Sequence, residues 1–166
     1  MNNESKRIAI VPGSFDPITK GHLDIVQRAA VSYDIVYLAI MINPEKKYMF
    51  TMDQRKRIAE AVVSSIANVR VITSKGMLWK LAKDLGACAI VKGYRNETDL
   101  AYEKEMEKFN REHNPDAKTV LLKSNDALAE ISSTAVRSRI LERKDLYEFL
   151  PQAAIDEIYK IISVKL

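Results

Sequence analysis

The stretch RIAIVPGSFDPITKGH, residues 7–22, sets an apolar run directly before a compact polar loop. The run at 7–11 does not alternate with polar residues, which is typical of a strand covered on both faces. The loop carries one of the two histidines of the chain, His22, near the start of a predicted helix, where backbone N–H groups and the helix dipole favour an anion. By composition alone, the loop fits a plain strand–turn–helix joint as well as it fits a phosphate site.

Four more runs rich in Val, Ile or Leu follow, with helical patterns between them. The predicted strands are 7–11, 34–42, 68–73, 88–93 and 118–124. The predicted helices are 22–31, 52–66, 77–85, 97–113, 133–142 and 152–163. Alternation of this kind favours a parallel sheet with right-handed crossovers. We predict one doubly wound, Rossmann-like α/β domain over 1–166, with a five-stranded parallel sheet in the order 3-2-1-4-5, a flexible start at 1–6 and a helical C-terminal part at 133–166.

Local patterns predict helix ends and buried positions. Thr51 with Gln54 three residues later has the pattern of a capping box, and Gly86 is expected to end the third helix. Cys88 lies in an apolar run and is expected to be a small buried core residue. The expected inward positions of the fourth helix are Leu100, Met106 and Phe109.

Composition limits the class of protein. Of 166 residues, 47% are hydrophobic and 29% charged, which is enough for one core with a well-solvated surface. The net charge of +4 and the pI of about 9.1 fit an anionic small ligand as well as nucleic acid. A single cysteine excludes an intrachain disulfide. The polar N-terminus lacks a secretory signal and no apolar run has the length of a membrane span, so we expect a cytoplasmic protein with no membrane partner.

Doubly wound sheets bind ligands beyond the carboxyl ends of their strands, and four unusual polar loops follow predicted strands here. They are GSFDPITKGH after the first strand, NPEKKYMF after the second, KGYRNETD after the fourth and SNDALAEISST after the fifth. Consecutive hydroxyls in the last of these can cap a helix and also bind phosphate. Neither the GxGxxG pattern nor a Walker loop is present.

These loops resemble the motifs of a known superfamily. Thr19-Lys20-Gly21-His22 is similar to the [HT]-x-G-H signature of the nucleotidyltransferases, and the preceding GSFDP resembles their adenylyl- and cytidylyltransferases. Ile131-Ser132-Ser133-Thr134 resembles the second signature, at the start of a late helix.

Other residues resemble the bacterial phosphopantetheine adenylyltransferase family in particular. The similar segments are Asn43–Lys47, Lys92–Arg95, the helix pattern Asp99, Tyr102, Glu103, Met106 and Asn110, and Phe149-Leu150-Pro151. The resemblance runs from about residue 7 to about residue 162. It implies transfer of the adenylyl group of ATP to 4′-phosphopantetheine, giving 3′-dephospho-coenzyme A and pyrophosphate, by direct in-line attack without a covalent enzyme intermediate.

The same resemblance implies the site residues. The catalytic residues that it implies are His22, Lys46, Ser14 and Arg95. The ATP-binding residues are Ser14, Phe15, His22, Gly93, Tyr94, Arg95, Glu103, Leu128, Ala129, Glu130, Ile131, Ser132, Ser133 and Thr134. The acceptor-binding residues are Ser14, Lys46, Met77, Leu78 and Lys92. A magnesium ion accompanies ATP, coenzyme A acts as a feedback ligand, and the chain forms a homohexamer, all as expectations from the family.

Lys92 departs from the family pattern, which usually has Arg there; an ammonium keeps the charge but not the bidentate geometry of a guanidinium. Lys20, Lys47 and Arg137 are expected to be solvated charges, and His113 a surface residue. Trp79 fits either the pantetheine pocket or a subunit contact. No carboxylate cluster suggests a protein ligand for the metal.

Two other functions remain open from the sequence. One is an adenylyl- or cytidylyltransferase of the same superfamily with another acceptor, such as nicotinate mononucleotide. The more distant one is a basic nucleic-acid-binding module, which would need clustered charge with aromatic residues between. Aromatic residues make up only 7% of the chain and are scattered, so we expect no nucleic-acid partner.

Overall fold

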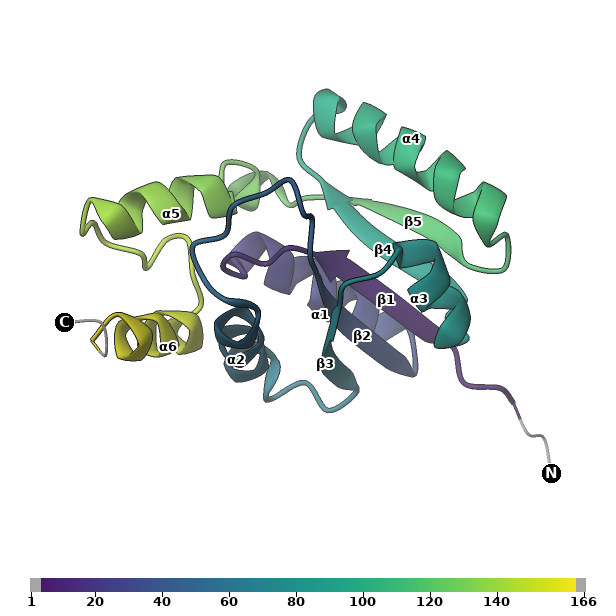
Figure 1. Ribbon diagram of the computed structural model, residues 1–166, viewed down its shortest axis with the longest axis horizontal. Helices are drawn as coiled ribbons and strands as arrows, with labels where there is room; N and C mark the ends of the chain where they lie inside the picture. Colours follow the sequence, from purple (N-terminus) through teal and green to yellow (C-terminus); the bar gives the residue numbers. More distant parts are fainter. Residues whose placement is uncertain (1–3, 164–166) are drawn as a thin grey trace.

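The protein contains a five-stranded parallel sheet, and the computed structural model describes residues 4–163 of the chain (Figure 1). The strand order is β3-β2-β1-β4-β5, which confirms the predicted topology. The strands are β1 (Ile8–Gly13), β2 (Ile35–Met41), β3 (Val69–Ser74), β4 (Ala89–Tyr94) and β5 (Lys118–Lys123). The chain runs outward from β1 in both directions, so the order reverses between β1 and β4, where such sheets bind ligands.

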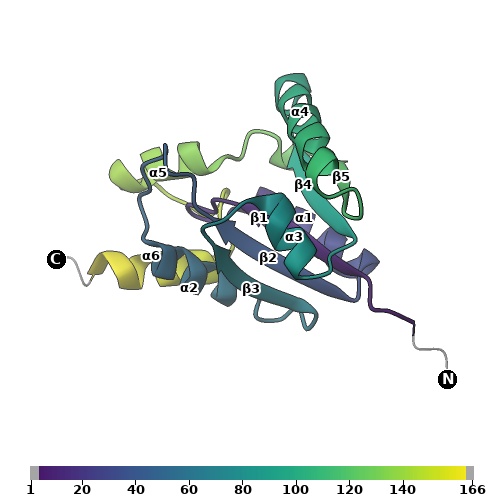
Figure 2. The same cartoon turned by 45° about the vertical axis from the view of Figure 1, so that its right-hand side comes forward.

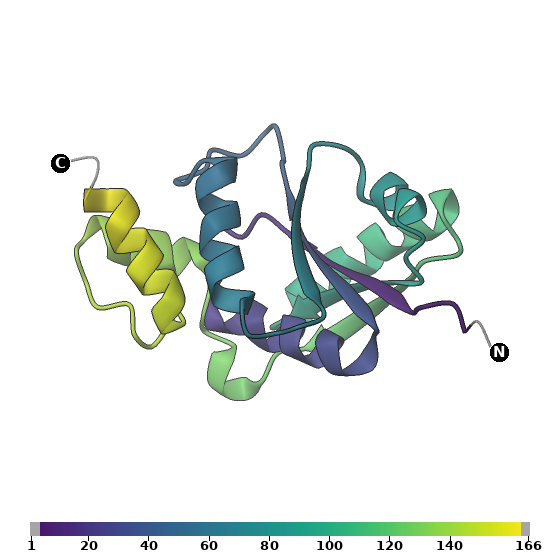
Figure 3. The same ribbon diagram turned by 90° about the horizontal axis from the view of Figure 1, so that it is seen from below.

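Helices cover both faces of the sheet (Figures 2 and 3). They are α1 (Lys20–Ser32), α2 (Met52–Val63), α3 (Leu78–Asp84), α4 (Glu97–His113), η1 (Asp126–Leu128), α5 (Ser133–Leu141) and α6 (Gln152–Ser163). On one face, Val26, Ile58 and Ile158 of α1, α2 and α6 share a core cluster with the sheet. On the other face, Ala82 of α3 packs with Ile10 and Ile90. Because helices bury the strands on both faces of the sheet, the strand sequences are continuous apolar runs.

Two predicted signals for helix ends are confirmed, although α1 begins at Lys20 rather than residue 22 and α2 ends at Val63 rather than residue 66. The Thr51 side chain accepts a hydrogen bond from Gln54 N, and the Gln54 side chain accepts one from Thr51 N, so α2 begins with the expected capping box. After α3, Gly86 has a φ of 63°, a left-handed conformation that glycine adopts without strain.

Two burial predictions are wrong. Cys88 is exposed, between the buried Ala87 and Ala89 just before β4, and its Sγ lies 3.4 Å from Ile8 O. Phe109 is 37% exposed, whereas Asn110 is only 4% exposed and takes the inward position on α4. Leu100 and Met106 are partly buried as predicted, whereas Phe109 lies against His113, with ring centroids 4.3 Å apart.

The domain prediction stays a prediction, and parts of it, residues 1–3 and 164–166, lie outside the described residues. Within residues 4–163, no helix is both long enough and apolar enough to cross a membrane.

Candidate functional site

The loop between β1 and α1 is held in place by a buried carboxylate. Asp16 is 2% exposed and accepts hydrogen bonds from Met49 N at 2.9 Å and Phe50 N at 3.0 Å. Next to it, Phe15 has a φ of 48°, a conformation that non-glycine residues hold only where surrounding contacts enforce it. The first loop is therefore tied to the second, which follows β2, at the carboxyl edge of the sheet.

His22 is fixed as a neutral hydrogen-bond donor. Thr19 caps α1, and its backbone N–H donates to His22 Nδ1 at 3.0 Å. Because an amide can only donate, Nδ1 accepts and the ring proton lies on Nε2. Burial, and then the positive charge of Arg95, lowers the pKa of His22 to about 4. No described residue accepts a hydrogen bond from Nε2, so this N–H is free for a ligand.

Two cations stand at the end of β4, the neighbour of β1. Lys92 Nζ lies 2.6 Å from Glu103 Oε2 of α4, and the two side chains are 21% and 13% exposed. The contact is an ion pair rather than an aligned hydrogen bond. Arg95 donates from Nε to Asp99 Oδ2 at 3.0 Å. Burial acts to raise the pKa of Asp99, but hydrogen bonds and charge from Arg95 outweigh it and lower that pKa.

Gly93, between these cations, allows a close contact. A Cβ at this position would lie 2.9 Å from Cγ1 of the buried Ile25 on α1. The absence of a side chain therefore lets β4 approach the helix that carries His22.

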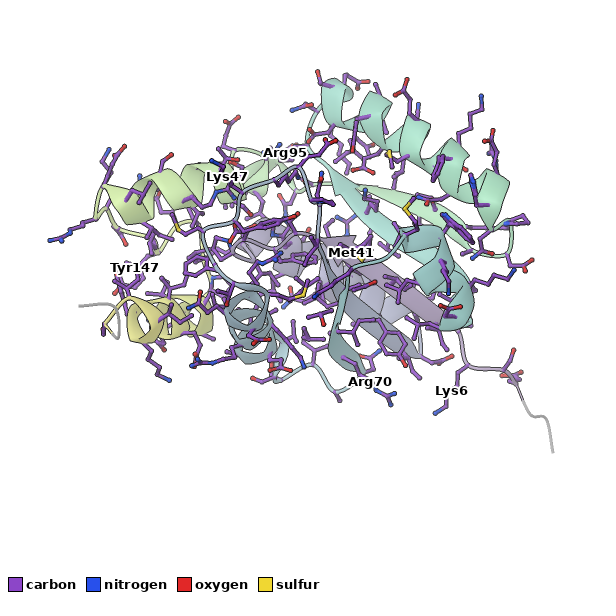
Figure 4. The ribbon with its side chains drawn as sticks, in the orientation of Figure 1. Lys6, Met41, Lys47, Arg70, Arg95 and Tyr147 are labelled. Carbon is purple, nitrogen blue, oxygen red and sulfur yellow. The ribbon has the colours of Figure 1, made fainter. Side chains whose placement is uncertain are left out.

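The second loop presents Lys46 to solvent. Lys46 N donates to Asn43 O at 3.0 Å, and Asn43 N donates to the Tyr48 hydroxyl at 2.7 Å, which shapes the turn. Lys46 Nζ makes no hydrogen bond or ion pair with another residue of the described range 4–163. Figure 4 shows Met41, Lys47 and Arg95 toward the carboxyl-end side of the sheet, with Lys6 and Arg70 toward the other.

The segment 131–134 lies against the first loop. Ser133 Oγ donates to Pro17 O at 2.9 Å, and Ile131 O lies 4.0 Å from where a Cβ of Gly21 would be. Ser132 Oγ caps α5 by accepting from Ala135 N, and Thr134 Oγ1 accepts from Arg137 Nη2. Each of the three hydroxyls thus already has a partner within the protein.

One of the three predicted solvated charges is structural. Arg137 Nη1 donates to Asp16 O at 2.9 Å and lies 3.8 Å from Asp16 Oδ2, so the prediction of an ordinary solvated charge is wrong. Its side chain joins α5 to the first loop. Lys20 Nζ donates to Tyr147 O at 2.5 Å, and Lys47 is exposed.

The two residues predicted to contact the pantetheine arm, Met77 and Leu78, follow β3. Met77 is 51% exposed, and Leu78 packs at the margin of the smaller core cluster. Trp79 lies beside His113 with ring centroids 5.2 Å apart, and the exposed His113 agrees with its prediction.

Sequence reasoning missed Asp16 and Arg55 as parts of this site. Arg55 is 2% exposed, and its Nη1 donates to Ser14 O at 2.8 Å. The sequence did contain a signal, because Arg55 lies three and seven residues before Ile58 and Val62 and so shares the apolar face of α2. A charged residue on a buried face needs a polar partner.

The described residues contain no group of three or more His, Cys, Asp or Glu side chains that could hold a metal ion. The nearby carboxylates are already engaged, Asp16 with backbone amides, Asp99 with Arg95 and Glu103 with Lys92. The side chains of the site therefore do not form a metal cage.

The fold and the loops at the sheet edge define a nucleotidyltransferase, and the cytidylyltransferase-like family model matches residues 10–139. Proteins named phosphopantetheine adenylyltransferase are similar over nearly the whole chain. The one from Streptococcus gordonii is 41% identical over 155 residues, covering 93% of this chain and 94% of its own. The one from Heliobacterium modesticaldum is 41% identical, covering 89% and 88%. The chain belongs to the phosphopantetheine adenylyltransferase family.

A solved structure supports the fold independently. A proposed nicotinate-nucleotide adenylyltransferase from Vibrio parahaemolyticus superimposes with a TM-score of 0.65, covering 92% of this chain and 99% of its own. Sequence identity is 17%, so this likeness concerns the architecture alone.

Proposed function

We propose that this enzyme transfers the adenylyl group of ATP to 4′-phosphopantetheine. A phosphate oxygen of the acceptor attacks the α-phosphorus in line, the bond from that phosphorus to the bridging oxygen breaks, and pyrophosphate leaves with the bonding electrons. The products are 3′-dephospho-coenzyme A and pyrophosphate. The observation that carries the proposal is the free Nε2–H of a neutral His22 at the switch point between β1 and β4, in a chain whose family relatives bear this activity in their names.

No general base is required, because the acceptor phosphate is already an anionic nucleophile. Catalysis then consists of positioning and stabilisation of the charge that develops around the α-phosphorus. His22 Nε2–H donates to an α-phosphate oxygen, and as a neutral donor it does so without losing a proton to the substrate. Arg95, whose charge already acts on the His22 ring, stabilises the same region.

ATP is held along the first, fourth and fifth loops. Ser14 and the Phe15 N–H contact phosphate, and Gly93, Tyr94 and Glu103 line the nucleotide site. Residues 128–134 cover the adenine, the ribose and the outer phosphates. The hydroxyls of residues 132–134 already have partners within the protein. This segment therefore binds ATP through its backbone groups and the remaining lone pairs of its hydroxyl oxygens.

The acceptor is held by the second, third and fourth loops. Lys46, which is exposed and unpaired among the described residues, can reach the attacking phosphate. Lys92 binds the same phosphate while it stays next to Glu103. Met77 and Leu78 contact the pantetheine arm, and Ser14 contacts both substrates.

Magnesium enters with ATP. Since the carboxylates of the site are already engaged, a bound ion would be held mainly by phosphate oxygens and water. A homohexamer and feedback by coenzyme A are further proposals drawn from the family.

A panel of acceptors tests the function. The purified protein is incubated with ATP or CTP and with 4′-phosphopantetheine, nicotinate mononucleotide or a cytidylyltransferase acceptor, and pyrophosphate release is measured. We expect release only with ATP and 4′-phosphopantetheine. The proposal fails if 4′-phosphopantetheine is inert while another acceptor reacts.

A further inference from the structure

Arg55 is a buried cation without a direct ion pair; burial lowers its pKa, and the charge of Asp16 acts in the opposite direction. It is 2% exposed on α2, and no carboxylate among residues 4–163 forms an ion pair with it. Its guanidinium instead donates to Ser14 O at 2.8 Å, lies 3.4 Å from Met41 O and stacks over the Tyr48 ring at 4.0 Å. Such burial of arginine is rare in proteins without a specific role for the side chain.

The hydrogen bond to Ser14 O acts on a peptide group that matters for ATP. Ser14 C=O and Phe15 N–H belong to the same trans peptide, so they point in opposite directions. A cation bound at the oxygen fixes the plane of this peptide and withdraws electrons from it, which makes its N–H a stronger donor. Phe15 N–H has no partner within the described part of the chain, and the φ of 48° at Phe15 shows that the turn is held by its surroundings.

The other contacts of Arg55 reach the second loop. The Tyr48 hydroxyl accepts from Asn43 N, and Asn43 O accepts from Lys46 N. A single planar guanidinium thus contacts the peptide of the first loop and the ring that shapes the turn of Lys46. An ammonium could keep the charge but not these two contacts together.

We propose that Arg55 is a positioning residue for adenylyl transfer, which orients and polarises the Ser14–Phe15 peptide so that its N–H binds phosphate. The inference rests on the proposed function, in which Phe15 N–H contacts ATP. Arg55 itself touches neither substrate and acts through this peptide and through Tyr48.

Kinetics of three variants form the first test. Arg55→Met removes both the charge and the N–H donors of the guanidinium, and Arg55→Lys keeps the charge alone. Arg57→Met is the control, because Arg57 lies on the same helix with its side chain 58% exposed and paired with Glu157. We expect kcat to fall about 100-fold in Arg55→Met, as when a preorganised donor is lost, with KM for both substrates changing much less. Arg55→Lys should recover part of this loss, and Arg57→Met should stay within about twofold of wild type.

A labelled peptide group gives a second readout, and its shift on addition of ATP is the part that a merely structural role would not move. Ser14–Phe15 is the sole Ser-Phe pair in the sequence, so labelling Ser carbonyls with ¹³C and Phe amides with ¹⁵N selects this peptide in an NMR spectrum. In the free protein, Arg55→Lys should move its ¹⁵N and ¹³C resonances, and Arg57→Met should not. On addition of ATP, the wild-type amide proton should shift downfield, with a smaller shift in Arg55→Lys.

The outcomes separate this inference from the proposed function. If the wild-type protein is inactive on 4′-phosphopantetheine, the proposed function is refuted. The spectrum of the free protein would still test the role of Arg55. If Arg55→Met does not fold, Arg55→Lys carries both measurements. Unchanged resonances in Arg55→Lys, or a kcat within about twofold of wild type in a folded Arg55→Met, would overturn the positioning role.

Discussion

Lys92 Nζ lies 2.6 Å from Glu103 Oε2, so the cation assigned to the acceptor phosphate and the carboxylate assigned to the nucleotide site form one ion pair. Both side chains are mostly shielded from water. Under the proposed assignment, the pair positions the ammonium before any phosphate binds and couples the two proposed subsites electrostatically.

Lys92→Met should weaken acceptor binding selectively. Loss of a charged contact to phosphate corresponds to about 1.5–3 kcal/mol, so the dissociation constant for 4′-phosphopantetheine should rise at least tenfold, with a smaller change for ATP. Isothermal titration of each substrate measures this. Lys92→Arg is the matched control and should keep the affinity. Equal losses for the two substrates would contradict the assignment.

The same variant should also be less stable, because Glu103 would remain shielded without its partner. We expect about 1–3 kcal/mol lower free energy of unfolding by urea denaturation. The double variant Lys92→Met/Glu103→Gln removes both charges and should regain stability without regaining phosphate affinity. A double variant no more stable than Lys92→Met would argue against the pair.

His22→Ala should lower turnover far more than ATP affinity. A donor that acts mainly in the transition state contributes about 100- to 1,000-fold to kcat. The imidazole also caps α1, so His22→Gln, which preserves the capping box, separates the two roles. Steady-state kinetics with ATP titration checks this. A His22→Gln variant with wild-type turnover would remove the histidine from catalysis.

The low pKa of His22 makes stability depend on pH. The folded ring resists protonation until about pH 4, whereas the unfolded ring binds a proton near 6.5. Unfolding therefore takes up a proton between these values, and the free energy of unfolding should rise with pH from about 4 to 6.5, by at most about 3 kcal/mol. Urea titrations at several pH values should show a shallower rise in His22→Gln. Identical slopes in both proteins would show that another group is responsible.

Asp16→Asn should disconnect the first two loops. An amide has one acceptor oxygen, so one of the backbone N–H groups of Met49 and Phe50 would face an NH₂ group. We expect a loss of about 2–3 kcal/mol in unfolding free energy and weaker ATP binding. Asp24→Asn removes only a partly exposed ion pair with Arg28. It should lower the free energy of unfolding by no more than about 0.5 kcal/mol. Comparable losses in both variants would contradict the special role of Asp16.

The strand order and most helix bounds could be predicted, because buried parallel strands and capped helices have strong local patterns. Thr51 with Gln54 and the left-handed Gly86 are such cases. The inward position of Asn110 on α4 was missed because Phe109 is its neighbour in the sequence, and hydrophobicity alone favours Phe109 as the inward residue. Cys88 was misplaced because an apolar run does not show where the strand leaves the core.

The motifs indicated which loops form the site, but not how these loops are joined. Asp16 binding the amides of Met49 and Phe50, and Arg137 binding Asp16 O, are contacts between residues distant in sequence. Each sequence motif covers a single loop and cannot show contacts with another loop, so Arg137 was predicted to be an ordinary solvated charge. Arg55 was the exception, since its place on an apolar helix face was visible in the sequence.

At Gly93 the missing side chain has a geometric consequence. Its α-carbon faces Ile25, and any Cβ there would lie 2.9 Å from Cγ1 of that residue. The strand that carries Lys92 therefore packs its main chain directly against the Ile25 side chain of the helix that carries His22, and no side chain at position 93 would fit between them. Any residue other than glycine at position 93 would therefore push β4 away from α1 and move Lys92 relative to His22.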